Sequence, residues 1–466
     1  MVNVVIVGGG PGGYEAALVA KAAGADVTLV ERQGLGGNAV LTDVVPSKTV
    51  IATAEWLTIA DRAGQLGIRD TRGHATGGAN HHTVDLGAVN ERVTRLADRQ
   101  SSDIHARLER EGVVVVRGTA QLTSPSTVAV DGTELHADAI LLALGARPRI
   151  LPGCEPDGER IFTWTQLYAL QELPEHLIVV GSGVTGAEFA GAYRTLGARV
   201  TLISSGDRVL ATQDPEAAAA VQDEFARRGM TVLGGARAAS VEAVAGGVRV
   251  TLADGRVIEG SHCLMAVGAI PNTEDVGLAH AGVDVDARGY IEVDRVSRTN
   301  AKGIYAAGDC TGVLQLASVA ATQGRIAMAH ALGDAVKPLD LREVASNVFT
   351  LPEIASVGAT EADLQRRGIF YEVSRLDLAR NPRAKMLGIE HGFVKIFGHT
   401  VTGQILGAVV VGPRAGESIF PLTLAVTHHL TVDDVASAFT VYPSLAGTIA
   451  EAARRLHTMT DGDGTR

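Results

Sequence analysis

The first 31 residues already show the pattern of apolar and polar positions that recurs along the chain. Val4–Val7 is an uninterrupted apolar run that predicts a buried strand, and a glycine-rich turn and a helix follow it. Val27–Val30 then predicts a second strand, which leads into the acidic residue Glu31. Strand, turn, helix and strand in this order predict a βαβ unit of the kind that binds dinucleotides.

Three glycines occupy the turn with the spacing G-x-G-x-x-G. Gly8 allows the sharp turn, Gly10 lets the backbone approach a pyrophosphate, and Gly13 lets the helix pack closely on the strand. The helix then offers free N–H groups and the positive end of its dipole to the phosphates. Glu31 lies 18 residues after Gly13, where an acid in such folds bonds ribose hydroxyls. We expect a dinucleotide here; the alternative is a glycine-rich turn without a ligand.

The same pattern returns 173 residues later. Leu177–Val180 predicts a strand, Gly181, Gly183 and Gly186 repeat the glycine spacing, and Val200–Ile203 predicts the strand after the helix. Two such motifs imply two dinucleotides, each bound by its own unit.

The second motif lacks the acid that ends the first one. Ser204 and Ser205 stand where a carboxylate would bind a ribose hydroxyl, and Arg208 lies close by. Without the acid, nothing there repels a 2′-phosphate. We expect NADPH to be tolerated, with a preference for NADPH as the stronger form of this hypothesis. The alternative is a site that accepts either nicotinamide cofactor through backbone contacts.

The rest of the chain divides into a mixed central part and a C-terminal part of different character. Residues 51–110 look mostly helical, and apolar runs predict further strands up to residue 144. In the last ~120 residues, alternating apolar and polar positions predict antiparallel strands, and two helical stretches complete an α+β unit without a third glycine motif. The predicted strands of this unit are Asn347–Leu351, Ile354–Val357, Tyr371–Leu376, Gly392–Phe397 and Gly403–Val411.

An acid follows another predicted strand, Ile304–Ala307. Asp309 comes after Gly308 at the carboxyl end of this strand, which is where ligands bind in open α/β sheets. It could bond a cofactor hydroxyl, or it could cap the helix that we expect to begin near Leu316.

Lys48 lies close to the start of another predicted helix. Pro46 disfavours helical geometry at Val45, and Ser47 could cap the helix that follows. Lys48 would then occupy the first helical turn, an unfavourable place for a cation next to the helix dipole. This placement suggests a local reason for the lysine, such as an anionic ligand or a carboxylate partner.

Composition narrows the class of protein. A chain of 466 residues is expected to form roughly two to four domains. The net charge of −11 argues against nucleic acid or an anionic membrane surface as partner, and no apolar run makes a credible spanning helix. The chain enters a predicted strand at once, so we expect no signal peptide and a cytoplasmic protein.

The cysteines and histidines do not suggest a metal site. Cys154, Cys263 and Cys310 show no C-x-x-C or metal-ligand spacing, which fits a reducing compartment without structural disulfides. The histidine pairs at 81–82 and 428–429 are expected to lie on solvated or helical surfaces. We expect no metal.

With these segments placed, the chain resembles the flavoprotein disulfide reductases, such as dihydrolipoamide dehydrogenase, glutathione reductase and mercuric reductase. The resemblance runs from end to end and includes both glycine motifs, the A-x-G-x-x-P turn of Ala143, Gly145 and Pro148, and the Gly308-Asp309 element. It implies an α/β fold with two Rossmann-like domains, for FAD and NAD(P), and a C-terminal α+β dimerisation domain. It also implies a homodimer.

The resemblance suggests domain boundaries and site residues. Residues 1–155, completed by 275–345, would bind FAD, residues 156–274 would bind NAD(P)H, and residues 346–466 would form the dimer interface. Lys48 and Glu188 match the family's pair beside the flavin; the alternative is an ordinary surface ion pair. Further cofactor-binding residues implied in this way are Gly118, Gly145, Ala317 and Gly268.

Two departures from the family bear on function. The family's redox stretch resembles G-G-x-C-x-x-x-x-C-x-P-S-K, but here Ala39 and Val44 replace both cysteines. No thiolate can form at either position, so no disulfide can take electrons there. The C-terminal element H-P-T-x-x-E, which the family supplies across the dimer, has Tyr442 in place of the base and Gly447 in place of the acid. Tyrosine, with an ordinary pKa near ~10, is a poor base at neutral pH.

These departures favour a diffusible electron acceptor. Our first hypothesis is an FAD-dependent NAD(P)H:quinone oxidoreductase, in which a flat ring stacks in the apolar and aromatic recess left by the thiols, with Tyr442 beside it. Within the family, the nearest resemblance is to actinobacterial NAD(P)H quinone reductases that look like lipoamide dehydrogenases without the cysteines. A soluble transhydrogenase-like flavoprotein is the second hypothesis, and a non-enzymatic or regulatory flavoprotein is the third.

Overall fold

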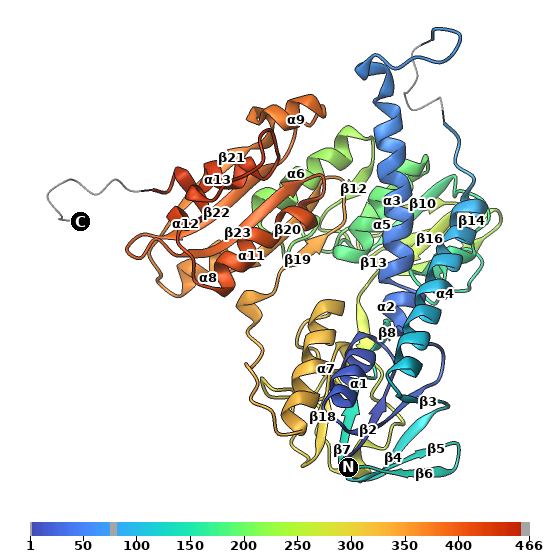
Figure 1. Ribbon diagram of the computed structural model, residues 1–466. Coiled ribbons are helices and arrows are strands. Elements are labelled where there is room, and N and C mark those ends of the chain that lie inside the picture. The colour runs from blue at the N-terminus through green and yellow to red at the C-terminus, as the bar shows by residue number, and fades with distance from the viewer. Residues whose placement is uncertain (1, 75–81, 458–466) are drawn as a thin grey trace, which may run out of the picture. The chain divides into compact units, whose positions relative to one another are not determined.

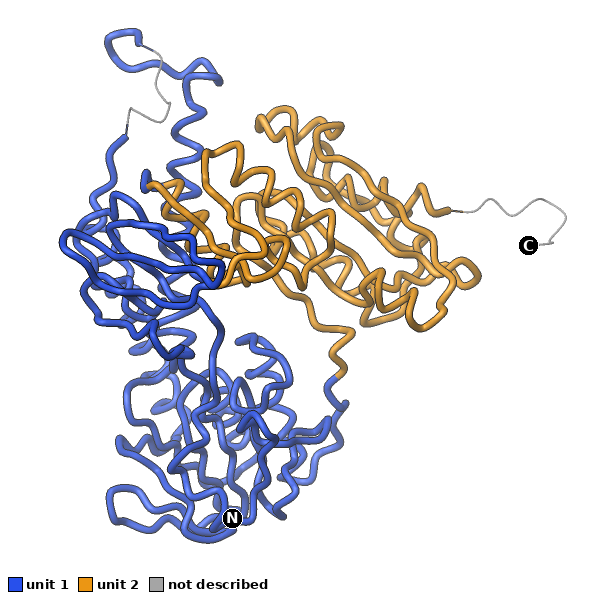
Figure 2. The backbone as a smooth tube through the Cα atoms, turned by 180° about the vertical axis from the view of Figure 1, so that it is seen from behind, with its two compact units in different colours: residues 1–180, 196–198, 238–339 blue, residues 181–195, 199–237, 340–466 orange. Residues whose placement is uncertain are grey.

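The computed structural model describes residues 2–74 and 82–457, so His81 and the last nine residues of the predicted dimerisation domain lie outside the described residues. The chain divides into two compact units (Figure 2), which are described separately. Unit 1 comprises Met1–Val180, Leu196–Ala198 and Ala238–Leu339; unit 2 comprises Gly181–Thr195, Arg199–Arg237 and Asp340–Arg466.

Unit 1 is built on a five-stranded parallel sheet with the order β18-β7-β1-β2-β3 (Figure 1). The strands, in this order, are β18 (Ile304–Ala306), β7 (Ala139–Leu142), β1 (Asn3–Val7), β2 (Asp26–Glu31) and β3 (Val114–Arg117). The sheet is therefore assembled from segments that are far apart in the sequence.

Both faces of this sheet are covered, which explains why its strands read as unbroken apolar runs. On one face, Val4 and Ile6 pack with α1 (Pro11–Ala22), α4 (Leu86–Arg110) and α7 (Ala317–Ala331). On the other face, alternate residues Val5 and Val7 pack against a three-stranded antiparallel sheet. The strands of that sheet are β4 (Ala120–Ser124), β5 (Thr127–Val130) and β6 (Thr133–His136).

Further strands complete unit 1. β16 pairs in parallel with β9 and with β10, and β10 is the strand that precedes the second glycine turn. The remaining strands form an antiparallel three-stranded sheet and an antiparallel pair. The bounds are β9 (Ile161–Thr163), β10 (His176–Val180), β16 (His262–Met265), β13 (Ala238–Val244), β14 (Gly247–Leu252), β15 (Val257–Gly260), β8 (Ala146–Pro148) and β17 (Ala269–Pro271).

The start of α3 differs from the prediction. α2 (Gly37–Leu41) is followed by α3 (Val44–Asp61), which begins before Pro46 and has Asp43 at its N-cap. Ser47 is not the cap, and Lys48 lies in the second turn rather than the first. Pro46 is the third helical residue, where its missing N–H would have had no partner within the helix, so it is tolerated there.

The alternative role for Asp309 is also wrong. α7 begins at Ala317 with Leu316 at the N-cap and no side-chain cap, whereas Asp309 lies in the 3₁₀ turn Asp309–Thr311. The acid therefore does not serve as the helix cap.

Unit 2 contains a five-stranded antiparallel sheet with the order β19-β20-β23-β22-β21. Its strands are β19 (Ser346–Val348), β20 (Glu353–Gly358), β23 (Ile405–Gly412), β22 (Phe393–His399) and β21 (Tyr371–Asp377), and each overlaps one of the five predicted strands. The helices of this part are α8 (Glu361–Arg366), α9 (Pro382–Met386), α10 (Ala415–Ser418), α11 (Phe420–Thr427), α12 (Val432–Ser437) and α13 (Gly447–Arg454).

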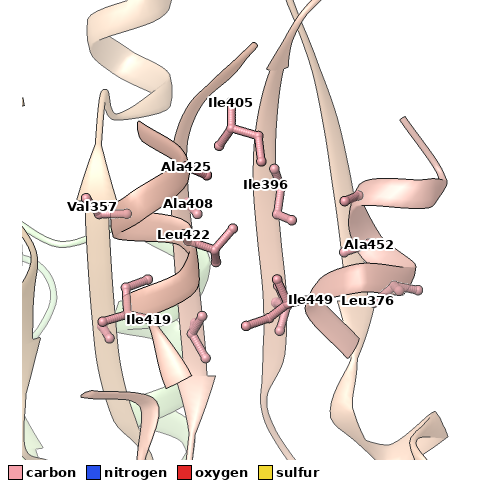
Figure 3. Packing of buried hydrophobic residues seen from close by; sticks show 14 of the residues in the cluster. Val357, Leu376, Ile396, Ile405, Ala408, Ile419, Leu422, Ala425, Ile449 and Ala452 are labelled. Atoms are coloured by element: carbon pink, nitrogen blue, oxygen red, sulfur yellow. The ribbon is translucent and has the colours of Figure 1, made fainter. Parts of the chain in front are cut away.

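The core of this part lies between the sheet and its helices. Figure 3 shows Ile396 and Ile405 of the sheet with Leu422 of α11 and Ile449 of α13 on either side. The other part of unit 2 contains the second glycine motif. It consists of α5 (Val184–Leu196), β11 (Arg199–Ile203), α6 (Pro215–Arg227) and β12 (Thr231–Leu233), in which β11 and β12 pair in parallel. Within residues 2–74 and 82–457, no helix combines the length and apolar character needed to cross a membrane.

Candidate functional site

The first glycine turn has the geometry that its sequence predicts. Gly8 has φ +103°, and a Cβ there would lie 2.2 Å from the Ala143 carbonyl oxygen. A Cβ on Gly13 would lie 1.8 Å from the Gly8 carbonyl oxygen, so only glycine allows the helix to pack this closely. By contrast, a Cβ on Gly10 would meet no atom within 4 Å, so the backbone here is open to a ligand.

The carboxylate of Glu31 is fixed beside this turn. One oxygen accepts a hydrogen bond from the Gly9 amide at 2.7 Å, and the other accepts from Gln33 at 2.7 Å and Gly34 at 3.3 Å. These bonds orient the acid at the end of β2, and its remaining lone pairs are those that a ribose hydroxyl would use.

Two helices begin next to the turn without side-chain caps. The N-cap of α1 is Gly10 and that of α7 is Leu316, which leaves their first N–H groups to other partners. The helices touch through backbone, since a Cβ on Gly324 would lie 2.0 Å from the Gly12 carbonyl oxygen. Gly12 in turn faces Ala320, three residues after Ala317 at the start of α7. The positive N-terminal ends of α1 and α7 therefore lie close to each other beside the first glycine turn.

Asp309 lies after β18, and no described residue donates a hydrogen bond to its carboxylate. Burial, together with the nearby charge of Asp43, raises the pKa of Asp309 to about 6. Gly308 before it has φ +83° and donates its N–H to Gln323 Oε1 at 2.9 Å, which fixes the turn. An acceptor held partly buried without a donor fits a ligand hydroxyl.

The segment that leads to α2 packs on the first glycine turn. The Gly36 amide donates to the Gly9 carbonyl at 2.8 Å, and a Cβ on Gly37 would lie 2.9 Å from the Gly10 Cα. The Asn38 side chain donates to the Ala146 carbonyl at 2.6 Å. Ala39 in α2 and Val44 at the start of α3 come soon after this segment in the chain.

Gly118 and Gly145, which the sequence also assigns to the flavin site, lie in unit 1. The Gly118 amide donates to the Glu31 carbonyl at 3.0 Å, which ties the end of β3 to the end of β2. Gly145 has φ +68°, and its carbonyl accepts from the Asn272 amide at 3.1 Å.

The predicted partners Lys48 and Glu188 belong to different units, so their pairing stays a prediction. Lys48 is partly buried in the second turn of α3. Glu188 on α5 is 3% exposed, and its carboxylate accepts a hydrogen bond from the Phe349 amide at 2.8 Å. A carboxylate this buried is costly unless it has a specific partner, so it marks a functional or structural role.

The second glycine turn repeats the glycine geometry of the first and has Ser182 in the place of Gly9. Gly181 has φ +107°, its amide bonds the Ile203 carbonyl at 3.0 Å, and a Cβ on Gly183 would meet no atom within 4 Å. Ser182 Oγ donates to Ser204 Oγ at 2.7 Å, which parallels the contact of Gly9 with Glu31 but without a charge.

Ser204 is fully buried, and its hydroxyl donates to the Gly206 carbonyl at 2.9 Å. Its hydroxyl is therefore already bonded within the protein, and its assignment to the nucleotide site stays a prediction. Ser182 was not among the predicted site residues. The signal was available, because Ser182 occupies in the second motif the place of Gly9 in the first.

The other predicted residues lie at the surface. Arg208 Nη2 donates to the Ala211 carbonyl at 3.2 Å within the loop after β11. Gly268 has φ +93°, a Cβ there would meet no atom within 4 Å, and its carbonyl accepts from the Arg149 amide at 2.9 Å. The Tyr442 side chain is 82% exposed in the single chain. No group of three metal-ligating side chains occurs among the described residues.

Comparison with known proteins places this geometry in a family. Residues 2–324 match the family described as pyridine nucleotide-disulphide oxidoreductase, and residues 344–453 match the dimerisation domain of that family. The chain belongs to the pyridine nucleotide-disulphide oxidoreductases. Members of this family use FAD and NAD(P)H.

Relatives within the pyridine nucleotide-disulphide oxidoreductases cover the whole chain. A Mycobacterium tuberculosis protein named NAD(P)H dehydrogenase (quinone) is 49% identical over 99% of this chain and 95% of its own length. The dihydrolipoyl dehydrogenase of Chlamydia trachomatis is 35% identical over 97% and 96%. The crystal structure of LpdA from Mycobacterium tuberculosis superposes with a TM-score of 0.93, at 49% identity, over 98% of this chain and all of that chain.

The thiols of this pyridine nucleotide-disulphide oxidoreductase are all buried. Its three cysteines, Cys154, Cys263 and Cys310, are free and buried, and none lies in α2 or α3. Burial raises the pKa of Cys310 to about 11, so the thiol stays protonated at neutral pH. The residues described contain no disulfide that could exchange electrons.

Proposed function

We propose that this protein is an FAD-dependent NAD(P)H:quinone oxidoreductase that works without a redox disulfide. The observation that carries the proposal is the pair Ala39 and Val44, which replaces the thiols in a chain that otherwise keeps both dinucleotide motifs. The relative that is 49% identical is itself named NAD(P)H dehydrogenase (quinone), which supports the same acceptor class.

The residues of unit 1 fit FAD. The open backbone at Gly10 and the N-termini of α1 and α7, which lack side-chain caps, suit a pyrophosphate. The oriented carboxylate of Glu31, and that of Asp309, to which no described residue donates a hydrogen bond, suit hydroxyl groups of such a ligand. When bound, FAD would supply the chemistry, passing a hydride from the nicotinamide to an acceptor. Gly118, Gly145 and Ala317 would border it.

The residues of the second motif are proposed to bind NAD(P)H. Gly181, Gly183 and Gly186 would face the pyrophosphate, while the loop that carries Arg208 would lie beside the ribose. Ser204 would act by holding that loop, because its hydroxyl already bonds within the protein. Gly268 would border the same site.

Lys48, Glu188 and Tyr442 are proposed as the catalytic residues. A cation beside the reacting ring would stabilise the negative charge that develops on reduction, and Glu188 would hold it in place. Tyr442 would be supplied by a second subunit and would stack on a quinone ring in a recess lined by Ala39 and Val44.

We propose three domains and a homodimer in the cytoplasm. Residues 1–155 with 275–345 would bind FAD, residues 156–274 would bind NAD(P)H, and residues 346–466 would dimerise. Exposed Phe439, Val441 and Tyr442, at 106%, 80% and 82%, support an interface in the last segment, since exposed apolar clusters mark association surfaces.

Anaerobic titration of the purified yellow protein tests the proposal. NADPH or NADH should bleach the flavin, and menadione added afterwards should restore its colour and accelerate NAD(P)H oxidation in turnover. Hydride transfer from NADPH to an NAD analogue without quinone would instead favour the transhydrogenase. A flavin that neither nicotinamide bleaches would exclude both enzymes.

A further inference from the structure

Lys395 is a buried charge in the part of unit 2 that matches the dimerisation domain. It lies on β22, where the residues from Phe393 to Gly398 are all buried, and it is itself 3% exposed. A lone ammonium in such a place would cost several kcal/mol, so its partners must explain it.

Three carboxylates surround the ammonium group. Lys395 Nζ lies 3.1 Å from Asp214 Oδ2, 2.7 Å from Glu216 Oε1 and 3.0 Å from Glu361 Oε2. Burial would lower the pKa of Lys395, but the hydrogen bonds from Glu216, Glu361 and Asp214 outweigh it and raise the pKa, so the lysine stays charged. A second cation, Arg375, binds the other oxygen of Glu216 at 2.8 Å.

Two of these acids, Asp214 and Glu216, belong to the part of unit 2 that contains the second glycine motif. Asp214 is the N-cap of α6: its Oδ1 accepts from the Glu216 and Ala217 amides at 3.0 Å and 3.1 Å. Its Oδ2 is the oxygen that binds Lys395, and the side chain is 8% exposed. One carboxylate thus starts the helix with one oxygen and attaches it to β22 with the other.

The loop between β11 and α6 is held at both ends. At its start, Ser204 Oγ donates to the Gly206 carbonyl. Past its middle, the Leu210 amide donates to the Ser182 carbonyl at 2.9 Å, next to the second glycine turn. At its end stands Asp214 with its bond to Lys395. The loop between these anchors carries Arg208 and would lie beside the ribose of the nucleotide.

We propose that Lys395 is a positioning residue for the pyridine-nucleotide site, holding the Ser204–Asp214 loop in its binding geometry from a strand of the C-terminal part. The inference rests on the proposed function, which assigns this loop to NAD(P)H. Lys395 does not touch the nucleotide itself; it acts through Asp214. Without the ammonium, Asp214, Glu216 and Glu361 would repel one another, and the start of α6 would move away.

The test uses FAD-loaded, full-length protein, four single variants and the double variant that combines Lys395→Met with Asp214→Asn. Lys395→Met removes the charge while keeping most of the volume, and Lys395→Arg keeps the charge. Asp214→Asn keeps the capping oxygen but replaces the oxygen that binds the ammonium. Lys385→Met is the matched control, because Lys385 is an exposed lysine on α9 that forms no ion pair within the part of the chain that the structure describes. Binding of NADP⁺ is measured by calorimetry, and KM for NADPH and kcat with menadione are measured separately.

We expect Lys395→Met to raise the NADP⁺ Kd and the NADPH KM by about tenfold with kcat changed less than about threefold. Asp214→Asn should weaken binding in the same way, and the double variant should be no worse than the single ones, since both break one link. Lys395→Arg should recover most of the affinity, and Lys385→Met should match the wild type.

A lower melting temperature with an unchanged NADP⁺ Kd, in either Lys395→Met or Asp214→Asn, would overturn the inference, because a purely structural ion pair predicts that result. If Lys395→Met does not fold, Asp214→Asn decides alone. If the wild type binds no pyridine nucleotide, the proposed function fails; if the wild type binds it and the variants bind it equally well, only the role of Lys395 fails.

Discussion

Asp309 has a partly buried carboxyl group whose ionisation destabilises the folded protein. Its carboxyl group is partly buried, Asp43 is close enough to disfavour ionisation, and no described residue donates a hydrogen bond to it. A pKa of about 6 means that the folded state holds this proton more tightly than the unfolded chain does. The folded protein therefore loses stability as pH rises from about 4 to above 6.

Replacement of Asp309 by Asn should stabilise the flavin-free protein at neutral pH. The gain should be on the order of 1 to 3 kcal/mol at pH 7.5 and about half of that at pH 5, where the wild-type carboxyl is largely protonated. Thermal or urea unfolding of both proteins across this pH range measures it. In the flavin-loaded protein the same change should lower FAD affinity; an equal gain with and without FAD would refute the assigned role.

Lys48 offers a second prediction at the scale of one residue. Lys48→Ala should slow reduction of the flavin by NADPH by about tenfold or more, because the developing negative charge loses its cation. FAD should remain bound, since the lysine is not part of the glycine turn. Stopped-flow absorbance measures the rate, and Lys21→Ala on α1 serves as a control. Unchanged reduction kinetics would remove Lys48 from the mechanism.

At the scale of elements, two glycines of the first turn, Gly10 and Gly13, have different surroundings although they are three residues apart. Gly13 faces protein backbone, with the Gly8 carbonyl oxygen 1.8 Å from a Cβ position, whereas Gly10 faces open space. Glycine is therefore required at position 13 by packing, and at position 10 only if a ligand approaches it. Substitution of Gly13 should therefore affect folding, whereas substitution of Gly10 should affect binding.

Gly13→Ala and Gly10→Ala should consequently differ. Gly13→Ala should displace α1 and destabilise the protein by about 1 to 3 kcal/mol or more, with or without flavin. Gly10→Ala should leave the stability of the flavin-free protein nearly unchanged while reducing the FAD content after purification. Calorimetric unfolding and the flavin-to-protein absorbance ratio distinguish them; a normal FAD content in Gly10→Ala would place the pyrophosphate elsewhere.

Sequence periodicity predicted the elements whose burial follows a regular pattern. The parallel strands β1, β2 and β10 were found because both faces of their sheets are covered, and the C-terminal strands were found through alternation. The start of α3 was placed too late, since Pro46 reads as a breaker although it is harmless in a first turn.

The candidate site was predictable where backbone geometry decides it and less so where side chains meet over long distances. The glycines and Glu31 are identified by their spacing. Asp214 followed by Pro215 is also a helix-start signal, but its second partner, Lys395, lies 181 residues away and no local pattern connects them. The burial of Ser204 against Ser182 depends on packing, which the local sequence pattern does not show.

At the scale of the whole molecule, one segment near the C-terminus leaves large apolar side chains uncovered. Phe439, Val441 and Tyr442 are 106%, 80% and 82% exposed, and they lie within the residues that match a dimerisation domain. Such exposure in a single chain is costly unless another surface covers it. It also bears on activity, because Tyr442 is proposed to serve the site of a second subunit.

Phe439→Asp should weaken the dimer and lower quinone turnover together. A charge placed in a covered apolar interface costs several kcal/mol, enough to shift the dimer towards monomer at micromolar concentration. Size-exclusion chromatography with light scattering measures the mass, and Val257→Asp, at a site 53% exposed on β15, is the control. A wild type that is monomeric would contradict the proposed assembly, whatever the variant does.

The backbone contact between Gly12 and Gly324 has a consequence for how the protein is made. The parallel sheet that contains β1 is complete only when β18 has been made, and α1 finds its backbone contact with α7 only when Gly324 has been made. A ribosome adding 5 to 20 residues per second needs roughly 15 to 65 s to pass from one glycine to the other. During that time the nascent chain holds an unfinished apolar edge, and we expect truncated products that end before α7 to lack the yellow cofactor.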